Sequence, residues 1–288
     1  MKISISALVD IGKQRTNNED AFIFCPDLSH PNWDQVETSS YTPIGRLGSL
    51  IVVADGMGGP NAGEVASSIA IDAIRHSFSD INLEEIIQKG DIKGFLQEVI
   101  GNAHNAIIDR VQEEPDTIGM GTTLVLCWVF DSIAYIAWCG DSRCYVYNPE
   151  KGLTALTKDH SYVQTLIDRG EMSEKDAFYH PDNNIITKGL GDIDCDPTPD
   201  VVTYSIKHSD ILLLCSDGLC GLCRKKAIEK ILDQHYDNIT LSKEKLLNAA
   251  LQAGGDDNIC IALASILSDD KENPAPLSFW TKLKRLLH

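Results

Sequence analysis

Four aspartates stand beside apolar runs that predict buried strands: Asp55, Asp141, Asp217 and Asp257. Three belong to Asp-Gly or Gly-Asp pairs, and the fourth closely follows a pair of glycines. Carboxylates at strand ends lie at the rim of a sheet, so four of them can converge although they are far apart in sequence. Oxygen ligands without a paired His or Cys favour Mg²⁺ or Mn²⁺ over Zn²⁺. A turn or cap role explains any one aspartate equally well, but it explains all four together poorly.

Two further segments contain groups that could bind a metal ion or a phosphate. The stretch Asp55-Gly56-Met57-Gly58-Gly59 lacks the spacing of a P-loop, and its aspartate favours a glycine carbonyl that approaches a metal. Arg15 precedes Glu19 and Asp20, and a guanidinium matches the geometry of a phosphate. The alternative for Arg15 is a surface position or an ion pair with Glu19.

The composition narrows the class of protein. The 288 residues are 43% hydrophobic, enough for one large domain or two small ones. A net charge of −17 argues against nucleic-acid binding and is compatible with metal binding or a basic partner. Nine cysteines, several of them inside apolar runs, are typical of reduced thiols, and no signal peptide or membrane span is indicated. We therefore expect a cytoplasmic protein that binds no nucleic acid.

The periodicity of the chain predicts strands, two helices, more strands, two helices and a last strand. Short breaks at 131–132, 140–142 and 207–210 indicate hairpins, so the sheets are expected to be mostly antiparallel. Two pairs of amphipathic helices need two sheet faces to cover, which predicts a layered sandwich with the helices outside. The expected strands are 2–9, 21–25, 49–54, 122–130, 133–139, 143–147, 201–206, 211–215 and 259–266, and the expected helices are 64–78, 94–113, 225–234 and 242–253.

Three segments depart from this pattern. Residues 26–48 predict a long surface loop, and residues 157–192 predict short helices in a small lobe over the main body. The domain is expected to span residues 1–267, and residues 268–288 form a linker and a basic amphipathic tail. For the tail, from 277 to 288, weak docking on a membrane or a protein partner stands against packing as a helix on the domain.

Seven segments, taken together and in order, resemble the motif series of the metal-dependent PPM (type 2C) serine/threonine protein phosphatases, in particular their bacterial branch. The resemblance runs from about residue 3 to residue 267. It implies an α+β fold, an α-β-β-α sandwich of two mostly antiparallel sheets flanked by helix pairs, with the lobe at 157–192 as a flap beside the metal cleft. The segments are Arg15-Thr16-Asn17-Asn18-Glu19-Asp20-Ala21, Val53-Ala54-Asp55-Gly56-Met57-Gly58-Gly59, Gly119-Met120-Gly121-Thr122-Thr123, Gly140-Asp141-Ser142-Arg143, Leu156-Thr157-Lys158-Asp159-His160-Ser161, Cys215-Ser216-Asp217-Gly218-Leu219 and Gly254-Gly255-Asp256-Asp257-Asn258.

The resemblance also implies roles for individual residues. One Mg²⁺ or Mn²⁺ is expected on Asp55, Asp217 and Asp257, with Asp55 bridging to a second ion. That second ion is expected to take the carbonyl of Gly56 and to contact Asp20 through water. A third, weaker ion is expected on Asp141 together with Asp217. Arg15 corresponds to the arginine that holds the substrate phosphate, so Arg15 and Asp55 are the expected catalytic residues.

The function implied is hydrolysis of phosphoserine and phosphothreonine in proteins by a water that bridges two metal ions. Expected partners are phosphoproteins, including a serine/threonine kinase or its targets, and the chain is expected to be a monomer. The alternatives are a hydrolase of small phosphorylated metabolites and a catalytically silent binding module with the same fold. Met57 stands where animal members carry the histidine proposed as general acid, so no acid is assigned. Asp256 stands where proline or serine is more usual.

Two further signals have plainer explanations. Cys220 and Cys223 have the spacing of a redox pair, but two packed, reduced thiols explain them better. His160 is of a catalytic type, yet its place in the motif series favours a structural role.

Overall fold

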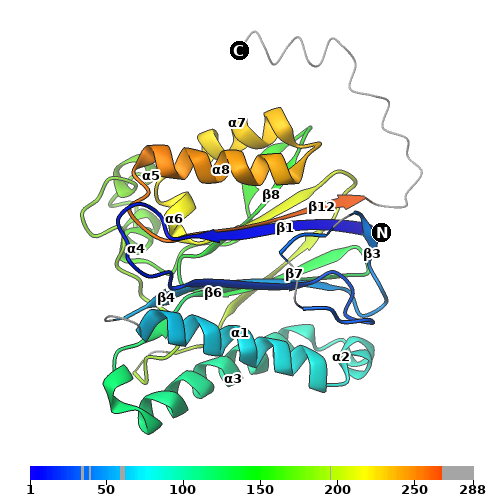
Figure 1. Ribbon diagram of the computed structural model, residues 1–288, viewed down its shortest axis with the longest axis horizontal. Coiled ribbons are helices and arrows are strands. Elements are labelled where there is room, and N and C mark those ends of the chain that lie inside the picture. Colours follow the sequence, from blue (N-terminus) through cyan, green and yellow to red (C-terminus); the bar gives the residue numbers. More distant parts are fainter. Residues whose placement is uncertain (34–35, 39, 59–61, 195, 268–288) are drawn as a thin grey trace.

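The protein is a four-layered α-β-β-α sandwich in the computed structural model, as predicted (Figure 1). Two antiparallel sheets stack face to face, with α1, α2 and α3 covering one outer face and α7 and α8 the other. The structure describes residues 1–33, 36–38, 40–58, 62–194 and 196–267. The predicted linker and tail, 268–288, therefore lie outside the described residues, as does Gly59. No helix in the described ranges is long and apolar enough to cross a membrane.

The first sheet has the strand order β3-β1-β12-β11-β8-β9, and the second has the order β10-β7-β6-β4-β2, with β5 pairing with β4 beside this path. All of these pairs are antiparallel. The strands are β1 (Lys2–Asp10), β2 (Asp20–Cys25), β3 (Thr42–Pro43), β4 (Ser49–Met57), β5 (Gly121–Thr122), β6 (Leu124–Phe130), β7 (Ile133–Cys139), β8 (Arg143–Asn148), β9 (Gly152–Ala155), β10 (Asp200–Ser205), β11 (Ile211–Cys215) and β12 (Ile259–Leu267).

The helices divide into those that cover the sheets and those near the cleft. Those on the outer faces are α1 (Ala62–Asp80), α2 (Leu83–Lys89), α3 (Ile92–Glu113), α7 (Lys225–His235) and α8 (Ile239–Ala253). Those near the cleft are α4 (Tyr162–Asp168), α5 (Glu174–Ala177) and α6 (Asp217–Cys220), and a 3-10 turn spans Pro115–Thr117. The sequence did not indicate α2, α6 or the short strands β3, β5 and β9, because each is too brief to show a period.

The core has three apolar layers, one between the sheets and one under each helical face. Trp128 of β6 is fully buried, and its ring meets Phe78 of α1 and Phe95 of α3 edge-on at 5.3 and 5.7 Å. The strands in the middle of the sheets contact apolar side chains on both faces, so β6 and β11 read as continuous apolar runs. This packing makes the sandwich a rigid support for the loops at its edges.

Two of the three predicted hairpins are wrong. The hairpin at 131–132 is confirmed, since β6 pairs with β7 and Asp131 and Ser132 both have positive φ, as a tight primed turn requires. At 140–142 the chain instead crosses between sheets, because β7 pairs with β6 and β10 while β8 pairs with β11 and β9. The segment between β10 and β11 crosses in the same way. Turn residues show where the chain changes direction, but they do not show which strand the following strand pairs with.

The long loop at 26–48 borders the first sheet. In its described part the Ala7 N–H donates to the Val36 carbonyl at 2.9 Å, and the Thr38 N–H donates to the Ile5 carbonyl at 2.9 Å. Glu37 accepts a hydrogen bond from Thr240 on α8 at 2.7 Å. The loop therefore satisfies backbone groups along β1 that would otherwise form an open sheet edge.

Candidate metal and phosphate site

Five aspartates predicted from the sequence come together near the ends of several strands. Asp20 opens β2 directly opposite Asp55 of β4 in the antiparallel register. The Asp55 carboxyl is close enough to those of Asp20 and Asp217 to share a proton with them, and it also feels the charges of Asp141 and Asp257. The convergence expected from the sequence is therefore present in the fold.

Asp55 and Asp217 do not lie in the turns that their Asp-Gly pairs suggest. The strand β4 continues through Asp55 to Met57, and Gly56 pairs with Thr122 of β5. Asp217 is the first residue of the short helix α6. The glycines after them permit close chain contacts instead: a Cβ on Gly56 would lie 2.2 Å from the Gly63 carbonyl oxygen. Glycine at positions 56 and 218 thus lets the chain beside each aspartate pack directly against neighbouring backbone.

Burial and mutual repulsion make four of these carboxylates, those of Asp20, Asp55, Asp141 and Asp217, unusually hard to ionise. Loss of solvent, together with the charge of Asp257, raises the pKa of Asp20 to about 8 and the pKa of Asp217 to about 6. Burial also raises the pKa of Asp55 and the pKa of Asp141 well above the usual aspartate range, with repulsion from neighbouring aspartates as the next cause. A nearby multivalent cation would relieve both effects.

Serine and threonine residues form hydrogen bonds that position the aspartate cluster. Ser216 Oγ donates to Asp20 Oδ2 at 2.7 Å and accepts from the Cys260 N–H at 2.9 Å. The Thr123 N–H donates to the Asp55 carbonyl at 2.8 Å, and the Thr123 hydroxyl hydrogen-bonds that of Ser142, next to Asp141, at 2.7 Å. Sequence patterns did not single out these hydroxyls, because a Ser or Thr beside a strand has no distinctive period.

Arg15 reaches the cluster from the segment before β2. Its Nη2 donates to Asp257 Oδ2 at 2.8 Å, and its side chain is 48% exposed. The pair with Glu19, which was the alternative for Arg15, is absent from the ion pairs of the described residues, although the charge of Glu19 does act on Arg15. The one bonded carboxylate leaves most of the five guanidinium N–H groups for an anion at the exposed side.

Asn258 is a positioning residue that the sequence reasoning missed. Its Nδ2 donates to the carbonyls of Ile11 at 3.0 Å and Asn17 at 2.9 Å, while its Oδ1 accepts from the Glu19 N–H at 2.8 Å. Its own N–H donates to Asp257 Oδ1 at 2.8 Å. One buried amide therefore ties the Arg15 segment to the aspartate before β12. The available signal was the asparagine directly after Asp257.

The Asp141 turn is joined to the lobe predicted at 157–192. The Gly140 N–H donates to His160 Nδ1 at 3.1 Å, the His160 N–H donates to the Gly140 carbonyl at 2.9 Å, and the His160 ring stacks on Trp138. The Thr187 N–H donates to the His160 carbonyl at 2.8 Å. These contacts agree with the structural role expected of His160.

The set of candidate ligands fits a hard divalent cation, although the side chains are not arranged in a complete coordination shell. In the described part of the chain, no group of three or more acidic, His or Cys side chains is arranged to enclose a metal. Two of the oxygens are instead turned to other partners, Asp20 to Ser216 and Asp257 to Arg15. Buried, mutually repelling carboxylates with no His or Cys among the predicted ligands nevertheless match the oxygen chemistry of Mg²⁺ and Mn²⁺.

Cys220 and Cys223 are not activated thiols, and the thioether of Met57 carries no acidic proton. The eight described cysteines are all buried and free. Burial raises the pKa of Cys223, and the neighbouring Cys215 thiol together with burial raises the pKa of Cys220, so neither is an activated thiol. The Met57 Cε methyl lies beside Gly121 and Gly189. No side chain at this position is assigned as general acid.

Comparison with known proteins decides the family. The model of the family described as protein phosphatase 2C matches residues 31–253, which is more than three quarters of the chain. The chain belongs to the protein phosphatase 2C family. It is 32% identical to the protein phosphatase PhpP of Streptococcus pneumoniae, a match that covers 94% of this chain and all of PhpP.

Two further similarities concern PstP. The chain is 33% identical to the serine/threonine protein phosphatase PstP of Mycobacterium tuberculosis over 79% of its own length, but it spans only 42% of PstP. A crystal structure of the PstP catalytic domain in complex with two manganese ions superposes with a TM-score of 0.73 at 30% identity, covering 93% of this chain and 99% of that one. The predicted type 2C fold is therefore confirmed.

Proposed function

We propose that this phosphatase 2C chain hydrolyses phosphoserine and phosphothreonine in proteins, in a reaction that depends on Mg²⁺ or Mn²⁺. The observation that carries the proposal is the convergence of five aspartates, two buried and three partly buried, with Arg15 at one site. Relatives named as serine/threonine protein phosphatases, and one with two manganese ions, support it. Phosphoproteins are the expected substrates, and a kinase partner and the monomeric state stay predictions.

The metal assignments are part of the proposal. Asp55, Asp217 and Asp257 would hold one ion. Asp55, the Gly56 carbonyl and Asp20 would serve a second, and Asp141 with Asp217 would serve a third. Divalent cations in such a site supply positive charge to a phosphoryl group and activate water for hydrolysis. This chemistry explains why the fold keeps carboxylates that resist ionisation when no cation is near.

The protein's own groups orient the substrate. We infer that Arg15 binds the phosphate, because its guanidinium is half exposed and is tethered beside the cluster by Asp257. Asn258 holds the Arg15 segment in place through three backbone contacts. A guanidinium fixed in this way presents paired N–H donors to phosphate oxygens without reorganising first.

The test is metal-dependent hydrolysis of p-nitrophenyl phosphate and of a phosphothreonine peptide. Activity is expected with Mn²⁺, is expected to vanish in EDTA, and should fall at least about a hundredfold in Asp55→Ala. Asp237→Ala, at an exposed site between α7 and α8, is the matched control. Full activity in EDTA refutes the proposal. Turnover of small phosphorylated metabolites but not of phosphopeptides favours the alternative hydrolase.

A further inference from the structure

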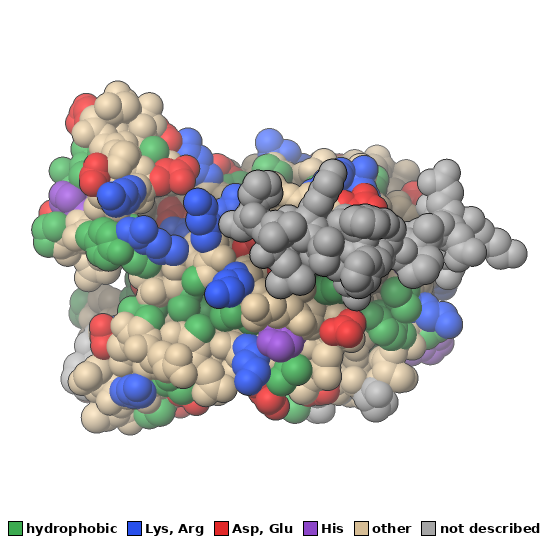
Figure 2. Space-filling view, turned by 90° about the horizontal axis from the view of Figure 1, so that it is seen from above, with side chains coloured by type: hydrophobic (Ala, Val, Ile, Leu, Met, Phe, Trp, Pro, Cys, Tyr) green, Lys and Arg blue, Asp and Glu red, His purple; other side chains and the backbone are tan. Residues whose placement is uncertain are grey.

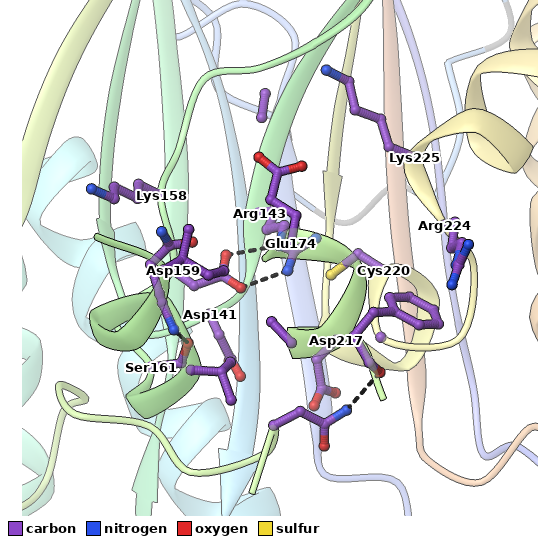
Figure 3. Close-up of a pocket in the computed structure, with 18 of the residues that line it drawn as sticks. Asp141, Arg143, Lys158, Asp159, Ser161, Glu174, Asp217, Cys220, Arg224 and Lys225 are labelled. Carbon is purple, nitrogen blue, oxygen red and sulfur yellow. Dashed lines mark hydrogen bonds and ion pairs between the residues drawn. The ribbon is translucent and has the colours of Figure 1, made fainter. Parts of the chain in front are cut away.

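A cleft opens directly beside the aspartate cluster. Its volume is about 710 Å³, and Asp141 and Asp217 are among the residues that line it (Figure 3). The other walls come from β8 and β9, from the flap with α4 and α5, and from the segment between α6 and α7 together with the start of α7. A polypeptide bound at the cluster therefore has room for its neighbouring residues in this cleft.

The cleft is lined by more positive charge than the acidic chain as a whole would suggest. Six Lys and Arg side chains line it, in a protein of net charge −17. Two are neutralised within the protein: Arg143 by Asp159 at 2.6 Å, and Lys158 by Asp168 at 2.6 Å. Figure 2 shows several Lys and Arg side chains together on the left of its face, the side on which Figure 1 has α4, α5 and α6.

The other four cations form what we call the basic wall: Lys175, Arg224, Lys225 and Lys226. Within the described ranges, none of them has a carboxylate at ion-pair distance, and all four are exposed. Glu174 is the one lining carboxylate left when Asp159 and the two cluster aspartates are set aside. Among the residues that the structure describes, the wall therefore keeps an excess of positive charge without an acidic partner.

Arg224 is held in place without using its hydrogen-bond donors. Its Cζ lies 4.7 Å from the ring centroid of Tyr179 and 5.3 Å from that of Phe178. Both rings follow α5 of the flap, whereas Arg224 immediately precedes α7. Stacking on aromatic faces orients a guanidinium and leaves its N–H groups at the edge for an anion. The contact also joins the flap to the opposite side of the cleft.

We propose that the basic wall binds acidic side chains, Asp, Glu or a second phosphorylated residue, that flank the phosphoserine or phosphothreonine of a protein substrate. This inference rests on the proposed function and narrows its substrate class. Charge complementarity is the reason for the choice, because unpaired cations in a cleft attract anionic segments and disfavour basic ones. The position next to the cluster is the second reason, since the cleft begins at Asp141 and Asp217 and a phosphate held at the cluster would place its flanking residues beside it.

The experiment compares three phosphothreonine peptides that differ only in flanking residues: acidic, neutral Gln and basic Lys. The acidic peptide is expected to have a kcat/KM about tenfold above the Gln peptide, the effect of a few exposed ion pairs. The difference should lie in KM rather than kcat, because flanking contacts bind the ground state and the transition state alike. The preference should weaken as salt is added.

Variants test whether the preference for acidic peptides depends on the basic wall. The double variant Lys225→Gln, Lys226→Gln is expected to lose most of the acidic preference, and Lys225→Glu with Lys226→Glu is expected to favour the Lys peptide. Lys230→Gln, also on α7 but outside the cleft lining, is the matched control and should retain the preference. All variants should hydrolyse p-nitrophenyl phosphate at the wild-type rate.

The outcomes separate the two proposals. Equal kcat/KM for the acidic and Gln peptides, with p-nitrophenyl phosphate hydrolysed normally, overturns the basic wall and leaves the phosphatase assignment intact. A preference that survives charge reversal at Lys225 and Lys226 overturns it as well. Absence of metal-dependent hydrolysis of every phosphorylated compound is instead the failure of the proposed function.

Discussion

Replacing Asp217 by Asn should stabilise the metal-free protein while it impairs catalysis. Asp217 opens α6, and burial with repulsion from Asp257 raises its pKa from 3.8 to about 6, although a hydrogen bond with Asp55 lowers it. Because the pKa is higher in the folded state, the protonated carboxyl stabilises the fold relative to the ionised carboxyl. This contribution to the free energy of unfolding is complete below pH 3.8 and is lost as the pH rises through about 6. At pH 7.5 the ionised group therefore opposes folding.

The magnitude follows from the size of the shift. About two pKa units correspond to about 3 kcal/mol at pH 7.5, and to almost nothing at pH 3.8 or below. The amide of Asn carries no charge at either pH. We therefore expect the free energy of unfolding of Asp217→Asn in EDTA to exceed that of the wild type by up to about 3 kcal/mol at pH 7.5 and to match it near pH 4.

Urea unfolding followed by circular dichroism, in EDTA at both pH values, measures this difference. Asp237→Asn, an exposed site, serves as the control and should change stability at neither pH. Added Mn²⁺ should raise the midpoint of the wild type by mass action and that of Asp217→Asn much less. If Asp217→Asn unfolds more easily than the wild type in EDTA at pH 7.5, the repulsion argument is wrong.

Three further changes test how the site is supported. Asn258→Ala should raise KM for phosphopeptides severalfold and lower the free energy of unfolding by about 1–3 kcal/mol, because it leaves buried backbone groups without hydrogen-bond partners. Steady-state kinetics measures the first effect and urea unfolding the second. Arg143→Met leaves Asp159 without its two guanidinium bonds, and thermal unfolding should show a loss of about 3–5 kcal/mol, whereas little change would mean that Asp159 is well solvated. Gly218→Ala places a Cβ 1.8 Å from the Asn258 carbonyl oxygen and should lower both activity and melting temperature, while Gly101→Ala, in open space on α3, should stabilise by about 1 kcal/mol.

Much of this fold was readable from the sequence because the elements that build it are long and periodic. The strand 2–9 is observed as Lys2–Asp10, and the helix 94–113 as Ile92–Glu113. The two crossings between sheets were misread as hairpins, because a turn of two to four residues looks the same whether the next strand joins its neighbour or the other sheet. Pairing across 60 or more residues, such as β8 with β11, leaves no local trace.

The sequence predicted some residues of the site but not others. Carboxylates at strand edges indicated that Asp55, Asp141, Asp217 and Asp257 converge, and the structure brings them within reach of each other's charge. Asp20 was harder to find from strand ends alone, because it begins a strand rather than following one. Asn258 acts through contacts with residues more than 230 positions away, and a pattern along the chain cannot show them.

Stability and catalysis pull against each other at this edge of the sandwich. The apolar layers bury Trp128 and its neighbours fully, whereas the aspartate cluster gathers like charges that raise each other's pKa. A sequence selected for stability alone would replace such carboxylates, so their convergence is best explained by a bound cation that neutralises them. The cations of the basic wall fit the same logic, since these four exposed positive charges have no carboxylate partner within the described ranges and would gain one when an acidic ligand enters the cleft.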